Sequence, residues 1–209
     1  MRDGGIGRIL VAALHQAIAD VLPDRLEFYE NWFHPGGLRA GRIGLAPITA
    51  VLSFLRREGD AYSQVMARAG EYAGEWTVEG LPRLRRKTVR LLPRVLRARA
   101  ALGIGRAIVR ETYGGSRAIV LNRRGRAVVD IRSSIFCGVR EPAPAPLCGF
   151  YEAAFARVLA RFDVPAALEI LCCRATGRDG CHVAITLPPV ASGRPQPAIP
   201  ASRTSDPTP

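Results

Sequence analysis

The sequence contains almost no lysine, and few of its residues are aromatic. Lys87 is the only lysine among 30 basic residues, and with 18 acidic residues the formal charge is +12. An anionic partner would fit this charge, but such a strong bias toward arginine, together with abundant alanine and glycine, also reflects a biased genome. We therefore do not infer nucleic-acid binding from the high isoelectric point alone.

The sequence also lacks a long apolar run. No stretch approaches the roughly 20 residues that span a bilayer, and polar residues interrupt the best N-terminal candidate, residues 6–22. We expect neither a membrane span nor a secretory signal. Without an export signal, the five cysteines predict reduced thiols in a cytoplasmic protein rather than a disulfide framework.

Sequence motifs of common enzymes are absent as well. There is no P-loop, no G-x-S-x-G elbow and no H-E-x-x-H pair. Gly103-Ile-Gly105 lacks the third glycine of a dinucleotide-binding fingerprint and follows a helical pattern. We therefore predict no catalytic residue and favour a binding protein over an enzyme.

The sequence shows helical periodicity from the N-terminus to about residue 113. Apolar residues recur every three or four positions, which predicts a series of amphipathic helices. Residues 81–110 hold ten basic residues and no acidic ones, and Pro93 should break a helix there.

The period changes after Gly114-Gly115. Apolar runs indicate two strand pairs, and helical spacing returns between them; the strands are predicted at 118–121, 127–131, 166–173 and 182–187, and the helix at 147–161. This order predicts an α+β fold, with N-terminal helices packed on an antiparallel sheet of two hairpins. We expect a single domain over residues 1–188, helical to about 113 and α+β over 116–188. Residues 189–209 are Pro-rich and predict a disordered tail.

Cysteines are concentrated in the second half of this domain. A turn after Cys173 would return Cys181 beside Cys172 or Cys173, and Cys148 could approach from the preceding helix. Thiolates and the carboxylate of Glu169 are suitable zinc ligands. Glu169 and Cys172 are three residues apart, so in an extended strand they face opposite sides unless a bulge intervenes. The alternative is that these are buried core cysteines.

One run of residues resembles a known family. It comprises Phe136-Cys137, Cys148-Gly149-Phe150-Tyr151, Glu169-x-x-Cys172, Gly177 and Cys181. Over residues 119–187 it is similar to the 4-vinyl-reductase domain family, related to the ligand-binding fold of the Golgi transport (TRAPP) subunits and the nitric-oxide sensors. The resemblance implies a TRAPP-like fold and a structural zinc ion bound by Cys148, Glu169, Cys172 and Cys181.

The resemblance also implies a hydrophobic ligand between the helices and the sheet. The aromatic candidates for this pocket are Phe28, Trp32, Phe33, Phe54, Tyr62, Tyr72 and Trp76. Each of them could instead be an ordinary core residue. His34 could cap the pocket or bind haem, although a histidine beside Pro35 is more typical of a turn.

The predicted function is thus a cytoplasmic protein that binds a hydrophobic small molecule. One alternative is a reductase, or an accessory protein, acting on a tetrapyrrole vinyl group in bacteriochlorophyll biosynthesis. Another is a TRAPP-like scaffold or membrane-surface protein, and a homodimer is compatible with each of these functions.

The basic segment 83–97 carries the membrane hypothesis. On a helical wheel Arg86, Arg90, Arg94 and Arg97 share one face, and Leu84, Leu91, Val95 and Leu102 share another. Such a helix can lie on an anionic membrane, or its arginines can form a solvated outer face. No aromatic residue interleaves the arginines, so nucleic-acid bases would lack a stacking platform.

Overall fold

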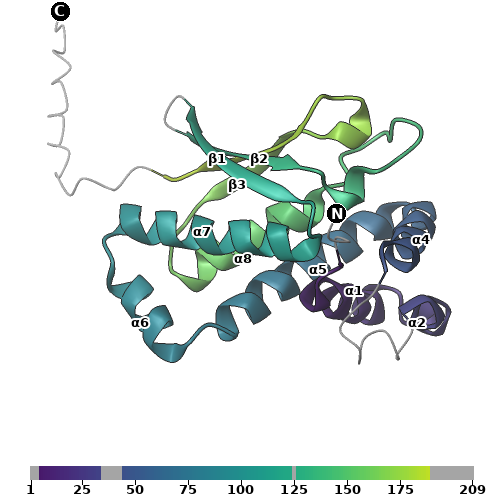
Figure 1. The fold of residues 1–209 in the computed structure, drawn as a ribbon, viewed down its shortest axis with the longest axis horizontal. Coiled ribbons are helices and arrows are strands. Elements are labelled where there is room, and N and C mark those ends of the chain that lie inside the picture. Colours follow the sequence, from purple (N-terminus) through teal and green to yellow (C-terminus); the bar gives the residue numbers. More distant parts are fainter. Residues whose placement is uncertain (1–4, 34–43, 124–125, 189–209) are drawn as a thin grey trace, which may run out of the picture.

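The computed structural model describes residues 5–33, 44–123 and 126–188. Figure 1 shows a sheet along one side of the molecule and the helices packed beneath it. The helices are α1 (Arg8–Val21), α2 (Leu26–Phe33), α4 (Leu45–Leu55), α5 (Asp60–Glu79), α6 (Arg83–Leu91), α7 (Arg94–Thr112) and α8 (Gly149–Arg161), and short 3-10 turns include η3 (Ile135–Cys137) and η4 (Arg174–Thr176). The predicted tail at 189–209 and His34 lie outside the described residues.

The sheet confirms the predicted α+β architecture. Its strands are β1 (Arg117–Arg123), β2 (Arg126–Arg132), β3 (Ala167–Cys172) and β4 (Cys181–Thr186). Their order is β1-β2-β4-β3 and every neighbouring pair is antiparallel, so the two hairpins meet along β2 and β4. Helix α8 lies between the hairpins in the chain, as the spacing predicts, and β1 and β3 are the free edges.

Proline and glycine positions explain several helix boundaries. Pro93 caps the N-terminus of α7 and separates it from α6, because proline has no N–H to continue the preceding helix. Helix α7 runs through Gly103 and Gly105 without a break. At Gly105 a side chain would collide with the ring of Phe155, so the missing side chain lets α7 and α8 approach closely.

The two central helices, α5 and α8, are in direct backbone contact. Gly70 and Gly74 of α5 face α8, and a Cβ atom at either would clash with α8 backbone or side-chain atoms. Helix α1 packs against α5 through buried apolar residues such as Leu14 and Ile18. This packing holds the N-terminus of α8, where Cys148 is the N-cap residue, against α5. No helix in the described ranges is long and apolar enough to cross a membrane.

Candidate metal centre and ligand groove

Four cysteines from separate segments meet at one buried point. Cys137 ends η3, Cys148 precedes α8, Cys173 follows β3, and Cys181 begins β4. Their sulfur atoms all lie within 4.8 Å of one another, and the four residues are between 0% and 5% exposed. Thiols far apart in the sequence therefore form a single cluster, which we call the cysteine cluster.

The cluster differs from the predicted ligand set at two positions. Two predicted ligands, Cys148 and Cys181, belong to the cluster. The other two, Glu169 and Cys172, lie outside it, and the cluster contains Cys137 and Cys173 instead. Glu169 is an exposed residue of β3, and the Cys172 sulfur lies 3.2 Å from His182 Nδ1 instead.

A β-bulge explains the exchange of Cys172 for Cys173. The register of β3 against β4 shifts between Ile170 and Cys172, so that Cys172 pairs with His182 while Ile170 pairs with Val183. Paired residues share a sheet face, and Val183 is buried under the helices whereas His182 is not. The bulge thus turns Cys172 to the outer face and leaves the next residue, Cys173, to point inward.

The chemistry of the four sulfurs fits one soft metal ion. Cys137 Sγ lies 3.3 Å from Cys173 Sγ and 3.4 Å from Cys181 Sγ. Zinc bound tetrahedrally at ~2.3 Å from each sulfur sets sulfurs about 3.8 Å apart, within the 4.8 Å that bounds the cluster. None of the cysteines forms a disulfide. Four thiolates around one point are typical of zinc or iron.

The thiols also perturb one another. Hydrogen bonds from Cys137, then from Cys148 and Cys181, lower the pKa of the Cys173 thiol. Hydrogen bonds with Cys137, Cys173 and Cys181 raise the pKa of Cys148. Ionisation of one thiol therefore disfavours ionisation of its neighbours, and a cation bound between them would offset this repulsion.

The predicted aromatic pocket is not one site. Phe28, Trp32 and Phe54 pack together, with ring centroids 5.2 and 5.3 Å from Phe54, but Phe28 and Trp32 are 39% and 36% exposed. Phe33 is buried in the core. Tyr72 and Trp76 stack on each other at the surface of α5, where the Tyr72 hydroxyl donates to Asp20. These six residues line none of the described cavities.

Tyr62, the seventh candidate, lines a groove between α5, α8 and β3. The groove has a volume of about 690 Å³, and its walls comprise Tyr62, Ser63, Gln64, Met66, Ala67, Pro146, Gly149, Glu152, Ala153, Ala156, Ala166, Leu168 and Ile170. The Tyr62 hydroxyl donates to the Leu147 carbonyl at 2.9 Å. Pro146 and Gly149 in its wall flank Leu147 and Cys148, so segment 146–149 joins the groove to the cysteine cluster.

Two histidines can be placed. His15 hydrogen bonds Glu30 on the surface, and His182 lies between Cys172 and Asp130. Neither histidine lines the cavities described in this section.

Part of the arginine face of the basic segment packs on the rest of the protein, while other arginines and some leucines of the segment are exposed. Arg90 and Arg94 turn back to the protein and donate to the carbonyls of Arg161 and Pro188. The apolar residues Leu84 and Leu91 are instead 77% and 85% exposed. Val89 is the only buried residue of α6.

Comparisons with known proteins identify the fold. No family model matches the chain, and no curated protein matches it. The phenol-responsive sensory domain of the transcription activator PoxR, solved with phenol, superposes with a TM-score of 0.52 at 16% identity, over 69% of this chain and 75% of that one.

Two structures of H-NOX proteins from Shewanella oneidensis also superpose over most of their length. The crystal structure in the Fe(II)NO state has a TM-score of 0.51, and the NMR structure in the Fe(II)CO state 0.52. Both are 13% identical to this chain and cover 87% of it, and 99% and 98% of their own chains are matched. The protein thus shares its fold with the PoxR domain and with these H-NOX proteins.

Proposed function

We propose that this protein binds a hydrophobic small molecule in the groove between α5, α8 and β3, and that the cysteine cluster holds one structural zinc ion. The main observation behind this proposal is that one short segment contributes to both the groove and the cysteine cluster. Pro146 and Gly149 line the groove, and Cys148 between them belongs to the cluster. A ligand in the groove would therefore contact the segment that the metal holds in place.

The groove suits a small apolar ligand with a few polar groups. Met66, Leu168 and Ile170 and several alanines form most of its wall, with Gln64 and Glu152 as polar residues. Its volume is within the range of small-molecule sites. The PoxR domain, which shares the fold, is solved with phenol, and this supports an aromatic or similarly compact ligand.

The proposed zinc ion acts as a structural tie. Cys173 and Cys181 belong to the β3–β4 hairpin, Cys137 to η3 and Cys148 to the start of α8. Binding all four thiolates to one ion closes the loops between these segments and stabilises the folded chain. This arrangement also supports the proposed kinship with the 4-vinyl-reductase domains, although the cysteines differ in part from the set that this resemblance implies.

Two matched variants of α8 test the groove. Ala156→Phe places a ring in the groove, whereas Ala160 lies one turn further along α8 and outside it. We measure the fluorescence of the neutral dye Nile red on titration with protein, and its displacement by phenol. Ala156→Phe should weaken dye binding about tenfold, equivalent to the loss of ~1.4 kcal/mol of contact.

Ala160→Phe should bind the dye as the unmodified protein does. Equal binding by all three proteins, or no binding by the unmodified protein, would contradict the assignment of the groove. The melting temperatures of both variants show whether each is folded.

A further inference from the structure

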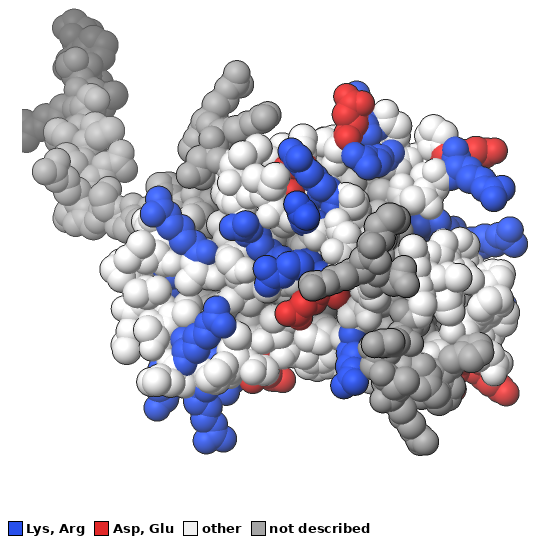
Figure 2. All heavy atoms as spheres, viewed as in Figure 1, with Lys and Arg blue, Asp and Glu red and all other residues white. Residues whose placement is uncertain are grey.

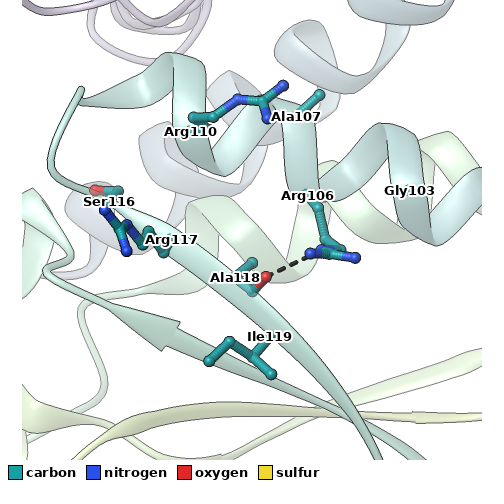
Figure 3. Close-up of a pocket in the computed structure, with 8 residues that line it drawn as sticks. All are labelled: Gly103, Arg106, Ala107, Arg110, Ser116, Arg117, Ala118 and Ile119. Atoms are coloured by element: carbon teal, nitrogen blue, oxygen red, sulfur yellow. Dashed lines mark hydrogen bonds between the residues drawn. The ribbon is translucent and has the colours of Figure 1, made fainter.

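A second hollow lies on the other side of the helical layer, between α7 and the edge strand β1. It has a volume of about 600 Å³ and is lined by Gly103, Arg106, Ala107, Arg110, Ser116, Arg117, Ala118 and Ile119. Figure 3 shows the two arginines of α7 and the one of β1 around this hollow, which we call the arginine cleft. Three of its eight lining residues are cationic and none is acidic.

The spacing of residues along α7 explains why two arginines share one face of the helix and why a space remains beside them. Arg106 and Arg110 are four residues apart and so lie on one face of α7. Gly103 and Ala107 have the same spacing on the neighbouring row, and a Cβ at Gly103 would meet no atom within 4 Å. Small residues therefore form the helical wall of the cleft and leave the guanidinium groups accessible.

One of the three arginines is held in position by the sheet edge. Arg106 Nε donates to the Ala118 carbonyl at 3.0 Å (Figure 3). Strand β1 is an edge of the sheet, so alternate carbonyl groups along it have no strand partner and are open to side-chain donors. The bond uses one of the five N–H donors of a guanidinium, and the terminal amino groups of Arg106 stay available for a ligand.

The charge of the cleft is not balanced by the protein. Arg117 lies directly opposite Arg132 in the β1–β2 register, and such like-charged pairs are unfavourable. Arg132 forms an ion pair with Asp130 at 3.1 Å. Among the described carboxylates, none forms an ion pair with Arg106, Arg110 or Arg117.

The neighbouring carboxylate also faces elsewhere. Glu111 follows Arg110 but lines a small cavity on the side of α1, with Ile9 and Leu10. Figure 2 shows basic side chains gathered over α7 and β1 on the face that carries the cleft. The local field therefore attracts anions.

From this arrangement we propose that the arginine cleft binds a small organic phosphate. Guanidinium groups match the oxygens of a phosphate in paired hydrogen bonds, and three cations around one hollow suit a doubly charged group. The volume admits one small molecule, and Ala107 and Ile119 offer contact to its organic part. No aromatic residue lines the cleft, so it lacks the stacking platform that single-stranded nucleic acid uses.

The test is a calorimetric titration of the full chain with glycerol 3-phosphate at low ionic strength. Glycerol is the neutral control, succinate the dicarboxylate control, and a single-stranded RNA 12-mer the polyanion control. We expect saturable binding of one glycerol 3-phosphate per chain and no binding of glycerol. The double variant Arg110→Gln/Arg117→Gln should bind about tenfold more weakly, and it preserves the bond from Arg106 to the edge of β1.

Two further variants distinguish binding in the arginine cleft from nonspecific attraction to surface arginines. Arg99→Gln removes an exposed arginine of α7 outside the cleft, and its affinity should stay within about twofold. Ala107→Leu keeps every charge but fills the hollow, and it should weaken binding as the double variant does, at an unchanged melting temperature.

The proposal is overturned by no binding of glycerol 3-phosphate, by equal losses in Arg99→Gln and the double variant, or by unchanged binding in Ala107→Leu. Succinate or RNA binding more tightly than glycerol 3-phosphate would also overturn the assignment to an organic phosphate. None of these outcomes bears on the groove or the cysteine cluster, because the arginine cleft shares no lining residue with either.

Discussion

The α5–α8 contact and the α7–β1 contact both contain small residues, yet one is closed and the other is open. Gly70 and Gly74 of α5 lie against α8, where even a methyl group would clash. Gly103 of α7 faces empty space in the arginine cleft. A glycine in a helix therefore allows a neighbouring element to pack closely, but the element does so only where its own backbone and side chains fill the space.

The cysteine cluster and the arginine cleft differ in how they accommodate like groups. The cysteine cluster is buried, so water cannot stabilise thiolates there, and a bound cation would favour their ionisation. Arg106, Arg110 and Arg117 are exposed, so water and dissolved anions stabilise them without any fixed partner. The two clusters therefore differ in burial as well as in residue type.

The largest expected effect comes from the cysteine cluster. Cys173→Ser removes one proposed zinc ligand, whereas Cys172→Ser changes the adjacent residue on the other face of the sheet. We expect Cys173→Ser to lower the melting temperature by about 10 °C, because the remaining three thiolates bind the ion more weakly. Cys172→Ser should lower it by about 2 °C or less. Differential scanning calorimetry measures both.

Elemental analysis of the same samples, purified without chelator, gives the metal content. About one zinc per chain is expected in the unmodified protein and in Cys172→Ser, and markedly less in Cys173→Ser. Absence of metal from all three, or equal destabilisation by the two substitutions, would refute the proposed site.

A glycine-to-alanine pair tests the closed and open contacts. Gly70→Ala forces α5 and α8 apart and should cost about 2 kcal/mol, or ~5 °C. Gly103→Ala adds a methyl group into open space and should stabilise α7 by about 0.5–1 kcal/mol. Thermal unfolding of both variants gives the sign directly. A loss of stability at Gly103 as large as at Gly70 would mean that the cleft is filled in solution.

The smallest effect concerns Glu152 in the groove wall. Burial, and to a lesser extent the charge of Glu169, raise the pKa of Glu152. The folded protein therefore binds this proton more tightly than the unfolded chain, and its contribution to stability is lost as the pH rises from below the ordinary glutamate pKa through the raised one.

Glu152→Gln removes this loss. After screening by solvent, the variant should melt about 1 °C higher than the unmodified protein at pH 7. The difference should vanish near pH 4, where Glu152 is protonated in both states. Melting curves across this pH range check the sign, and a variant less stable at pH 7 than at pH 4, relative to the unmodified protein, would contradict it.

Much of the architecture follows from local patterns. Helical periodicity and the break at Pro93 predict the helices before α8, and short apolar runs predict the two hairpins. The cysteine cluster was predictable only in part. Cys148 and Cys181 come together as the resemblance implies, but the resemblance also implies Cys172, whereas the bulge after Ile170 turns Cys173 inward instead. The adjacent cysteines at 172 and 173 were the signal in the sequence that either residue could lie beside Cys181.

The aromatic residues and the basic segment show the same limit. The sequence does not show that Phe28 and Trp32 pack on Phe54 and stay partly exposed, whereas Phe33 is buried in the core. The helical wheel separates arginines of 83–97 from leucines, but it does not show that Arg90 and Arg94 bond to distant carbonyl groups while Leu84 and Leu91 are exposed.

The sequence by itself determined which segments are helices and strands, because local propensity and spacing act over a few residues. Only the tertiary structure decided which cysteines join the cysteine cluster, which arginines surround a hollow and which side of α6 is exposed. These outcomes depend on a one-residue bulge, on the space between α7 and an edge strand, and on carbonyl groups of Arg161 and Pro188 that lie far along the chain. Long-range packing creates such contacts, and no local pattern encodes them.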